Sequence, residues 1–112
     1  MKIRSLALAL AFALLPAFAV AQGMKMGEGD ADQALMKAMQ DMQQGMQTDM
    51  TGDADKDFVA MMIPHHQGAI DMAKAELQYG KDASLRKLAT AIIKAQEKEI
   101  AGMKRWQAKH AK

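Results

Sequence analysis

The sequence predicts an all-α protein of three helices in an up-down arrangement. Three stretches carry apolar residues at helical spacing, and each is long enough for several turns. Short segments rich in glycine and aspartate, at 51–53 and 80–82, separate these stretches and read as connections. No stretch alternates apolar and polar residues as a half-buried strand does, and 112 residues allow a single domain.

The first 21 residues have the features of a cleaved signal peptide. Lys2 and Arg4 form a basic start, residues 6–19 are mostly apolar, and residues 19–21 form a small-x-small cleavage site. The apolar run is shorter than the roughly 20 residues needed to span a bilayer, which disfavours the alternative of an uncleaved anchor. We expect cleavage after Ala21, a periplasmic or secreted location, and no membrane attachment of the mature chain.

The composition of the mature chain argues against nucleic-acid binding and favours soft-metal chemistry. The leader holds two of the 15 basic residues, so 13 remain against 13 acidic ones, and the net charge is zero. Acidic residues gather before residue 58 and basic residues after it, which favours attraction between the helices. Cysteine is absent and methionine abundant, and thioethers bind soft metals without the cross-linking that thiols undergo in an oxidising compartment.

The mature chain is predicted to begin with a disordered arm at 22–30, QGMKMGEGD, followed by a helical metal-binding domain over 31–112. The first helix is predicted over 31–50, with Gly45 on its polar side and Gly52 as a C-terminal cap. At about 100° per residue, its apolar residues share an arc of about 120°. These residues are Leu35, Met36, Met39, Met42, Met46 and Met50.

The second helix is predicted over 55–79, with Asp53 or Asp55 as its N-terminal cap. Its apolar arc includes Phe58, Met61, Met62, His65, His66 and Met72. We therefore expect both histidines on the buried side, each with a methionine one turn before it. Pro64 is predicted to kink this helix, because the alternative of a helix that begins at Pro64 would have Ile63 as a poor cap.

The third helix is predicted over 83–108, with a cap at Asp82 or Ser84. Gln96 lies at the centre of its apolar stripe, and a buried amide needs partners, so we expect it to bond the histidines. Glu76 is expected to pair with Arg86 across the connection between the second and third helices.

Antiparallel pairing brings histidine and methionine side chains from all three helices to one level. Reflection about the two connections places His65 opposite residue 39 of the first helix and residue 97 of the third. The predicted metal ligands are His65, His66, Met61, Met62, Met72, Met39, Met42, Met46 and Met103. Mixed thioether and imidazole donors suit Cu(I), with Ag(I) as a surrogate, whereas imidazole alone would also take Cu(II), Zn or Ni. The alternative is that methionine is flexible core filler and the histidines are buried and hydrogen-bonded.

Part of the chain resembles a known family. The runs that carry the resemblance are Met62-x-Pro64-His65-His66-x-x-Ala69-Ile70-x-Met72-Ala73 and Leu85-Arg86-x-Leu88-Ala89-x-x-Ile92-Ile93-x-x-Gln96-x-x-Glu99-Ile100-x-x-Met103. They are similar to the family catalogued as domain of unknown function 305, a ferritin-like helical family of exported bacterial proteins. The resemblance implies a likeness to periplasmic copper-binding and copper-resistance proteins, with ligands among Met61, Met62, His65, His66 and Met72. The methionine-rich first helix lies outside this resemblance.

These observations predict a non-enzymatic periplasmic protein that binds copper for storage, transfer or resistance. We expect the metal ion as its ligand, with another periplasmic copper carrier and a second copy of the chain as candidate partners. A di-iron enzyme would need a Glu-x-x-His pair, and the residues three before the histidines are Met62 and Ile63. A second alternative is a metal-independent interaction module whose methionine face binds another helix.

Overall fold

The computed structural model of the protein describes residues 29–111, and three helices make up most of this part. Helix α1 spans Asp30–Gly45, α2 spans Ala54–Tyr79 and α3 spans Ala83–Lys109. The prediction of an all-α, three-helix arrangement is confirmed, and residues 29–111 contain no strand. The predicted leader at 1–21 and nearly all of the predicted arm at 22–30 lie outside the described residues.

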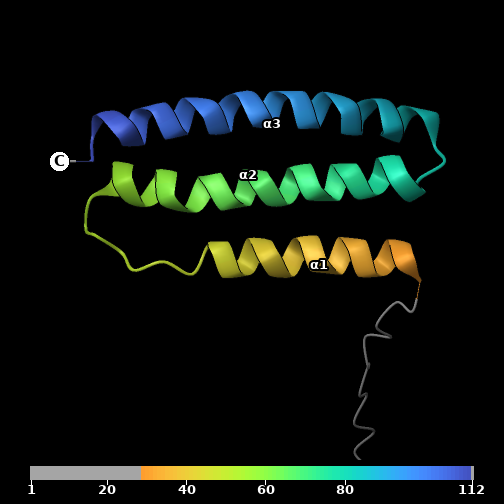
Figure 1. The fold of residues 1–112 in the computed structure, drawn as a ribbon, viewed down its shortest axis with the longest axis horizontal. Coiled ribbons are helices and arrows are strands. Elements are labelled where there is room, and N and C mark those ends of the chain that lie inside the picture. Colours follow the sequence, from red (N-terminus) through yellow and green to blue (C-terminus); the bar gives the residue numbers. More distant parts are fainter. Residues whose placement is uncertain (1–28, 112) are drawn as a thin grey trace, which may run out of the picture.

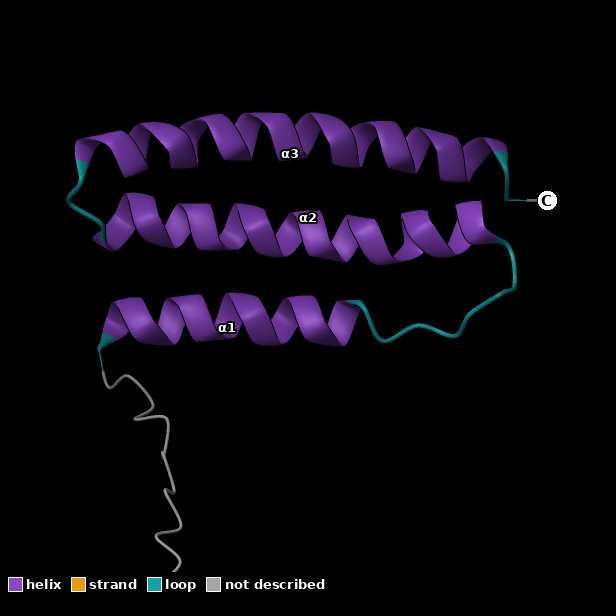
Figure 2. Ribbon diagram, turned by 180° about the vertical axis from the view of Figure 1, so that it is seen from behind, coloured by secondary structure: helices purple, strands orange, loops and turns teal. Residues whose placement is uncertain are grey.

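The three helices lie side by side as an open, flat bundle (Figure 1). Helix α2 is central and antiparallel to both neighbours, and the view from behind shows the same order (Figure 2). Within residues 29–111, α1 and α3 each pack on α2 and do not contact one another. The bundle therefore has two broad faces that no further helix of the described chain covers.

Two opposite sides of α2 are buried, one against each neighbour. Val59, Ile70 and Ala73 are buried on the side that faces α3. Gly68 and Ala75 are buried half a helical turn away, on the side that faces α1. The predicted single apolar arc of α2 therefore becomes two contact stripes with an exposed strip on each side between them.

Side-chain caps hold the start of α2 and of α3. The Asp53 carboxylate accepts hydrogen bonds from the backbone N–H groups of Asp55 and Lys56, at 3.0 and 3.2 Å. Asp82 accepts a hydrogen bond from the backbone N–H of Leu85 at 2.9 Å, so it caps α3 in preference to Ser84. These bonds satisfy amide groups that have no partner in the first helical turn.

The first helix is shorter than the prediction of 31–50. Helix α1 ends at Gly45, and the chain then runs without helix to Asp53. Thr51 is tied to the first turn of α2, because its backbone N–H and its hydroxyl both donate to the Asp57 carboxylate, at 2.9 and 2.8 Å. Gly52 has a φ of +83°, which glycine adopts easily, so it shapes this connection and does not cap α1.

Helix α2 continues without interruption through Pro64, so the alternative of a helix that begins there is wrong. Gly45 of α1 faces this proline: a Cβ atom added at Gly45 would lie 2.6 Å from the Pro64 Cβ. The prediction that Gly45 lies on a polar side of its helix was therefore wrong. Its lack of a side chain lets the end of α1 approach the proline ring.

No helix within residues 29–111 is both long enough and apolar enough to cross a membrane.

Candidate metal centre

His66 is the best-defined polar group of the candidate site. It is 9% exposed, and its Nε2 atom lies 2.5 Å from a carboxylate oxygen of Glu99 on α3. Its other ring nitrogen, Nδ1, is buried and has no hydrogen-bond partner within residues 29–111. The carboxylate accepts from Nε2, which directs the proton to that nitrogen and leaves a lone pair on Nδ1 of the neutral ring.

His65 differs from its neighbour, and the expectation that both histidines are buried was wrong for it. The His65 side chain is exposed, and the two ring centres lie 6.2 Å apart with their planes at 60°. Adjacent residues on a helix point about 100° apart, so only one of the two can face α3. His66 takes that direction, and His65 points out of one broad face of the bundle.

The partner of His66 is Glu99 and not the predicted Gln96. Gln96 is half-buried, and its side chain makes no hydrogen bond with another described residue. The observed partner, Glu99, lies about one helical turn beyond the predicted partner, Gln96, along α3. Helical side chains lean toward the N-terminus of their own helix, and in an antiparallel pair this lean moves the contacting positions farther from the connection. Glu99 was visible in the sequence as part of the family-like run, but its role was not.

The predicted ion pair between Glu76 and Arg86 does not form. The Arg86 guanidinium instead donates to the backbone carbonyls of Leu77 and Gly80, at 2.6 and 3.1 Å. These carbonyls belong to the end of α2 and to its cap, where carbonyl groups lack helical partners and a cation is favourable. Arg86 thereby holds the start of α3 against the end of α2.

The contact between α1 and α2 has a different register from the predicted one. A Cβ atom added at Gly68 would lie 2.7 Å from both the Cβ and the Sδ atoms of Met42, so these residues face each other. With Gly45 opposite Pro64, His65 comes level with residues 44–45 of α1 instead of residue 39. Met42 and Met46 thus flank the level of the histidines. Met39 lies nearer the level of Met72.

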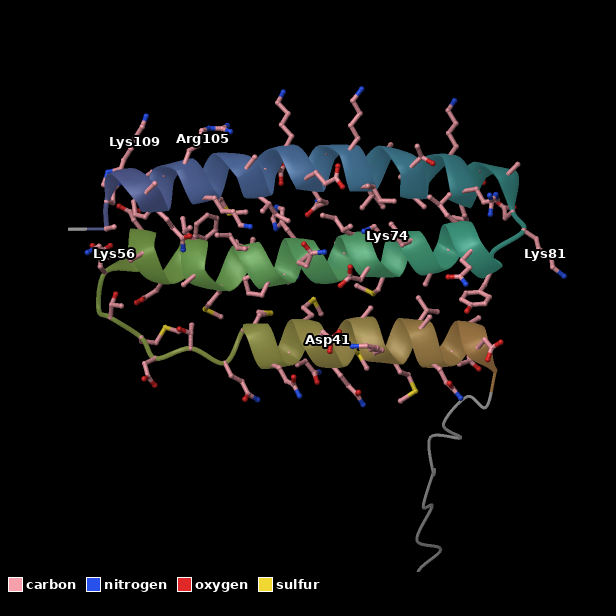
Figure 3. All side chains as sticks on the ribbon, in the orientation of Figure 1. Asp41, Lys56, Lys74, Lys81, Arg105 and Lys109 are labelled. Carbon is pink, nitrogen blue, oxygen red and sulfur yellow. The ribbon has the colours of Figure 1, made fainter. Side chains whose placement is uncertain are left out.

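Methionine sulfurs are concentrated where α1 meets α2 (Figure 3). Met42 is half-buried against Gly68, and Met46, also half-buried, is the C-terminal cap residue of α1. Met61 and Met62 are half-buried one turn before the histidines on α2. The structure therefore brings four predicted sulfur donors to the level of the histidine pair.

Two of the remaining predicted ligands, Met39 and Met72, lie farther along the bundle, whereas Met103 lies on α3 one helical turn after Glu99. Met72 lines a shallow groove with Leu35 and Leu88, and Met103 lines a second hollow with Phe58 and Trp106. On α2, positions 58, 65, 69, 72 and 76 lie within about 60° of one another, so both hollows and His65 share one broad face. We call this surface the open apolar face. It comprises Leu35, Met39, Phe58, His65, Ala69, Met72, Leu85, Leu88, Ile92 and Met103, and toward the end of α2 it also carries Glu76.

Histidine and carboxylate groups do not by themselves form a metal cluster in the described part of the chain. No three residues of the types His, Cys, Asp and Glu come together in residues 29–111. Methionine supplies the other soft donors of these helices.

The third histidine, His110, lies at the end of α3 and is exposed, as expected for a residue near the C-terminus. Its ring stacks on Trp106 with ring centres 4.2 Å apart, and its Nδ1 atom lies 2.8 Å from the Trp106 carbonyl oxygen. These contacts occupy one ring nitrogen and one ring face. His110 therefore offers a control for the two histidines of α2.

The fold and the site define a class of helical protein in which a histidine–carboxylate pair lies near methionine sulfurs. The sequence profile described as "Domain of unknown function (DUF305)" matches residues 9–107, and the chain belongs to this family. A similar relative is "Uncharacterized protein L153" of Acanthamoeba polyphaga mimivirus, which is 45% identical over 49 residues. The similarity covers 44% of this chain and 32% of that protein, so the chain spans about a third of the relative's length.

Proposed function

We propose that this protein is an exported, non-enzymatic copper-binding protein that holds Cu(I) through histidine and methionine side chains. The observation that carries the proposal is the environment of His66. Histidines that bind metals commonly present one ring nitrogen to the ion while the other bonds a carboxylate. In His66, Glu99 engages Nε2, and the buried Nδ1 is left with no hydrogen-bond partner in the described chain.

The sulfur donors decide which metal the site would favour. Met42, Met46, Met61 and Met62 lie at the level of the histidines, and thioethers are soft ligands that prefer Cu(I) or Ag(I) to zinc. On α2, Met62 lies about 40° from His66, so an ion at His66 could take the Met62 sulfur. Met42 and Met46 lie on the opposite side of α2, toward α1, where Met61 and His65 are the nearer donors. Either arrangement would give an ion a mixed nitrogen and sulfur environment. His65, exposed on the open apolar face, would be the group through which an ion enters or leaves.

The biological role that fits this donor set is copper storage, transfer or resistance outside the cytoplasm. The leader-like start and the absence of cysteine support this role, since free thiols oxidise readily in such compartments. A thioether site can also pass Cu(I) to another periplasmic carrier by exchange of ligands. No step of this proposal requires a chemical transformation.

The test is native mass spectrometry of the purified protein with Cu(I) under reducing conditions. We expect a defined number of bound copper ions, competed by Ag(I). Replacement of His65 and His66 together by alanine should remove the tight site. His110→Ala is the matched control and should leave uptake unchanged, because that ring is stacked on Trp106 at the end of α3. If the double variant takes up as much copper as the wild type, the assignment of the site to these histidines is wrong.

A second measurement tests the role of Glu99. Carboxylates that orient a ligating histidine typically affect metal affinity by about 10- to 100-fold. We expect Glu99→Gln to weaken Cu(I) binding by about this factor in a competition titration, with the same number of ions bound at saturation. An unchanged affinity would separate Glu99 from the metal site.

One observation favours a second candidate function, a metal-independent interaction module. Several large apolar side chains of the open apolar face are strongly exposed, among them Phe58 at 58% and Leu88 at 54%. A face of this kind can bind a partner helix. Partner binding that survives in a chelator, in a protein that takes up no copper, would favour this function over the first.

A further inference from the structure

The open apolar face is a large surface that the described chain leaves uncovered. A domain normally buries its apolar surface between at least two packed layers, and residues 29–111 form only one layer of helices. The opposite face of α2 is polar and carries Gln67, Lys74 and Gln78. The difference between the two faces shows that the exposure of the apolar one does not come merely from the thinness of the bundle.

We infer that a second copy of this chain covers the open apolar face, with the two-fold axis of the dimer parallel to α2. A symmetric dimer pairs the same surface patch of both copies. The face is about 39 Å long, from the 26 residues of α2. Strips about 9 Å wide along α1, α2 and α3, which have 16, 26 and 27 residues, together give an area of about 900 Å². A stable interface needs about 800 Å² from each partner, so the face is large enough.

Charge selects the direction of the two-fold axis. The chain from Asp30 to Asp53 carries five aspartates and one lysine, whereas α3 carries seven basic and two acidic residues. Several of these basic side chains, including Arg105 and Lys109, project from the outer edge of α3 (Figure 3). An axis parallel to α2 stacks α1 of one copy on α3 of the other and brings opposite charges together. An axis across the helices would stack each helix on its own copy and bring like charges together.

This geometry places His65 of the two copies opposite one another. Under a two-fold axis parallel to α2, each residue on the facing side of α2 meets its own copy at the same level. The two His65 rings therefore lie in the centre of the interface, with Met61 and Met62 beside them. If the proposed copper function holds, ions bound at His65 lie between the copies. The dimer itself rests on the apolar face and not on copper.

Sedimentation equilibrium in a chelating buffer tests the dimer. We expect twice the monomer mass for the wild type. Leu88→Glu places a negative charge on the open apolar face at a position that is already 54% exposed, so the helix should still form. In the proposed dimer this charge faces the acidic α1 of the other copy, so it should weaken association by about tenfold or more. The matched control, Ala101→Glu, adds the same charge to α3 at an exposed position that lines the opposite face, and should leave the dimer intact.

A wild type that stays monomeric at high concentration overturns the proposal, whatever else covers the face. The proposal is also overturned if Ala101→Glu disrupts the dimer and Leu88→Glu does not, since the other face would then be the interface. Circular dichroism of each variant keeps loss of association distinct from loss of folding.

Cross-linking tests the direction of the axis. The chain has no cysteine, so a single introduced thiol reports only on its own copy. We expect Phe58→Cys and Ala69→Cys, examined separately, each to form a disulfide-linked dimer under mild oxidation, and Gln78→Cys on the opposite face to stay monomeric. An axis across the helices brings at most one level of α2 onto itself, so a link at only one of the two positions would exclude the parallel axis.

The proposed copper function and the proposed dimer can be contradicted independently. A monomeric protein that binds Cu(I) through the histidines overturns this inference and leaves the proposed function in place. A dimer in chelating buffer that takes up no copper overturns the function and leaves the interface in place.

Discussion

At the scale of single residues, the pair of His66 and Glu99 joins the centre of α2 to α3. The imidazole is buried and the carboxylate is 58% exposed, so water weakens the interaction but does not replace it. Without the carboxylate, both ring nitrogens of a buried histidine would lack a partner, which is costly.

Glu99→Ala should lower the free energy of unfolding by about 1 kcal/mol because it removes the partner of His66. Glu97→Ala is the control. Glu97 is exposed on the same helix, with no ion pair among the described residues, so its replacement should change the free energy by less than about 0.5 kcal/mol. Urea denaturation followed by circular dichroism gives both values. If both variants lose the same free energy of unfolding, the pair of His66 and Glu99 makes no specific contribution to stability.

At the scale of helices, close approach depends on residues without side chains. Gly68 accepts Met42 of α1 directly on its backbone, and Gly45 lies against Pro64 in the same contact. These two glycines set the register between α1 and α2. The same register brings Met42 and Met46 to the level of the histidines.

Gly68→Ala should destabilise the protein by about 1–3 kcal/mol, because the new methyl group would overlap Met42 and push the helices apart. Gly102→Ala should have the opposite effect on the free energy of unfolding. A Cβ at Gly102 meets only the end of the Arg105 side chain, at 3.8 Å, so the better helix propensity of alanine should stabilise α3 by about 0.5–1 kcal/mol. Thermal or urea unfolding measures whether each variant is less or more stable than the wild type. If Gly68→Ala also stabilised the protein, this would contradict the close contact between Gly68 and Met42.

The cap of α3 makes part of the stability depend on pH. The Ser84 hydroxyl and then the Leu85 amide donate to Asp82, and these bonds lower the pKa of its carboxyl below the usual 3.8. Because the folded pKa is the lower one, the stabilisation is complete above 3.8 and is lost as the pH falls through the folded pKa.

We therefore expect the unfolding temperature to fall as the pH is lowered below the usual pKa of 3.8, and to fall less in Asp82→Asn. Asparagine also caps helices but does not titrate in this range, so the variant isolates the charge. Ser84→Ala should likewise reduce the slope, because it removes the first donor. Identical slopes in all three proteins would contradict the assignment.

At the scale of the whole molecule, one thin layer of helices has a small core. The buried apolar residues are mainly alanine with a few branched side chains, namely Val59, Ile70 and Ile100. Most of the large apolar side chains that are exposed lie on the open apolar face, namely Leu35, Met39, Phe58, Leu85 and Leu88. Much of the hydrophobic stabilisation available to this chain is thus realised only when that face is covered.

If a second copy covers the face, the thermal unfolding midpoint of the wild type should rise with protein concentration, because folding and association are then linked. Leu88→Glu should have a lower midpoint with little dependence on concentration, and Ala101→Glu should behave as the wild type does. Differential scanning calorimetry over a wide concentration range measures this. A midpoint independent of concentration in the wild type would speak against linked association.

The sequence by itself determined the three helices and the family, and it narrowed the caps of α2 and α3 to two candidates each, because helical spacing and capping depend on neighbours along the chain. The structure selected Asp53 and Asp82 from these candidates. It also identified histidine and methionine as the candidate donors. The tertiary structure alone decided that His66 meets Glu99 instead of Gln96, that Met42 and Met46 replace Met39 at the histidine level, and that His65 faces outward. These outcomes depend on the lean of side chains between antiparallel helices, and on the place where Gly45 and Gly68 let α1 approach α2. Such contacts are set by packing across the bundle, which spacing along a single helix does not contain.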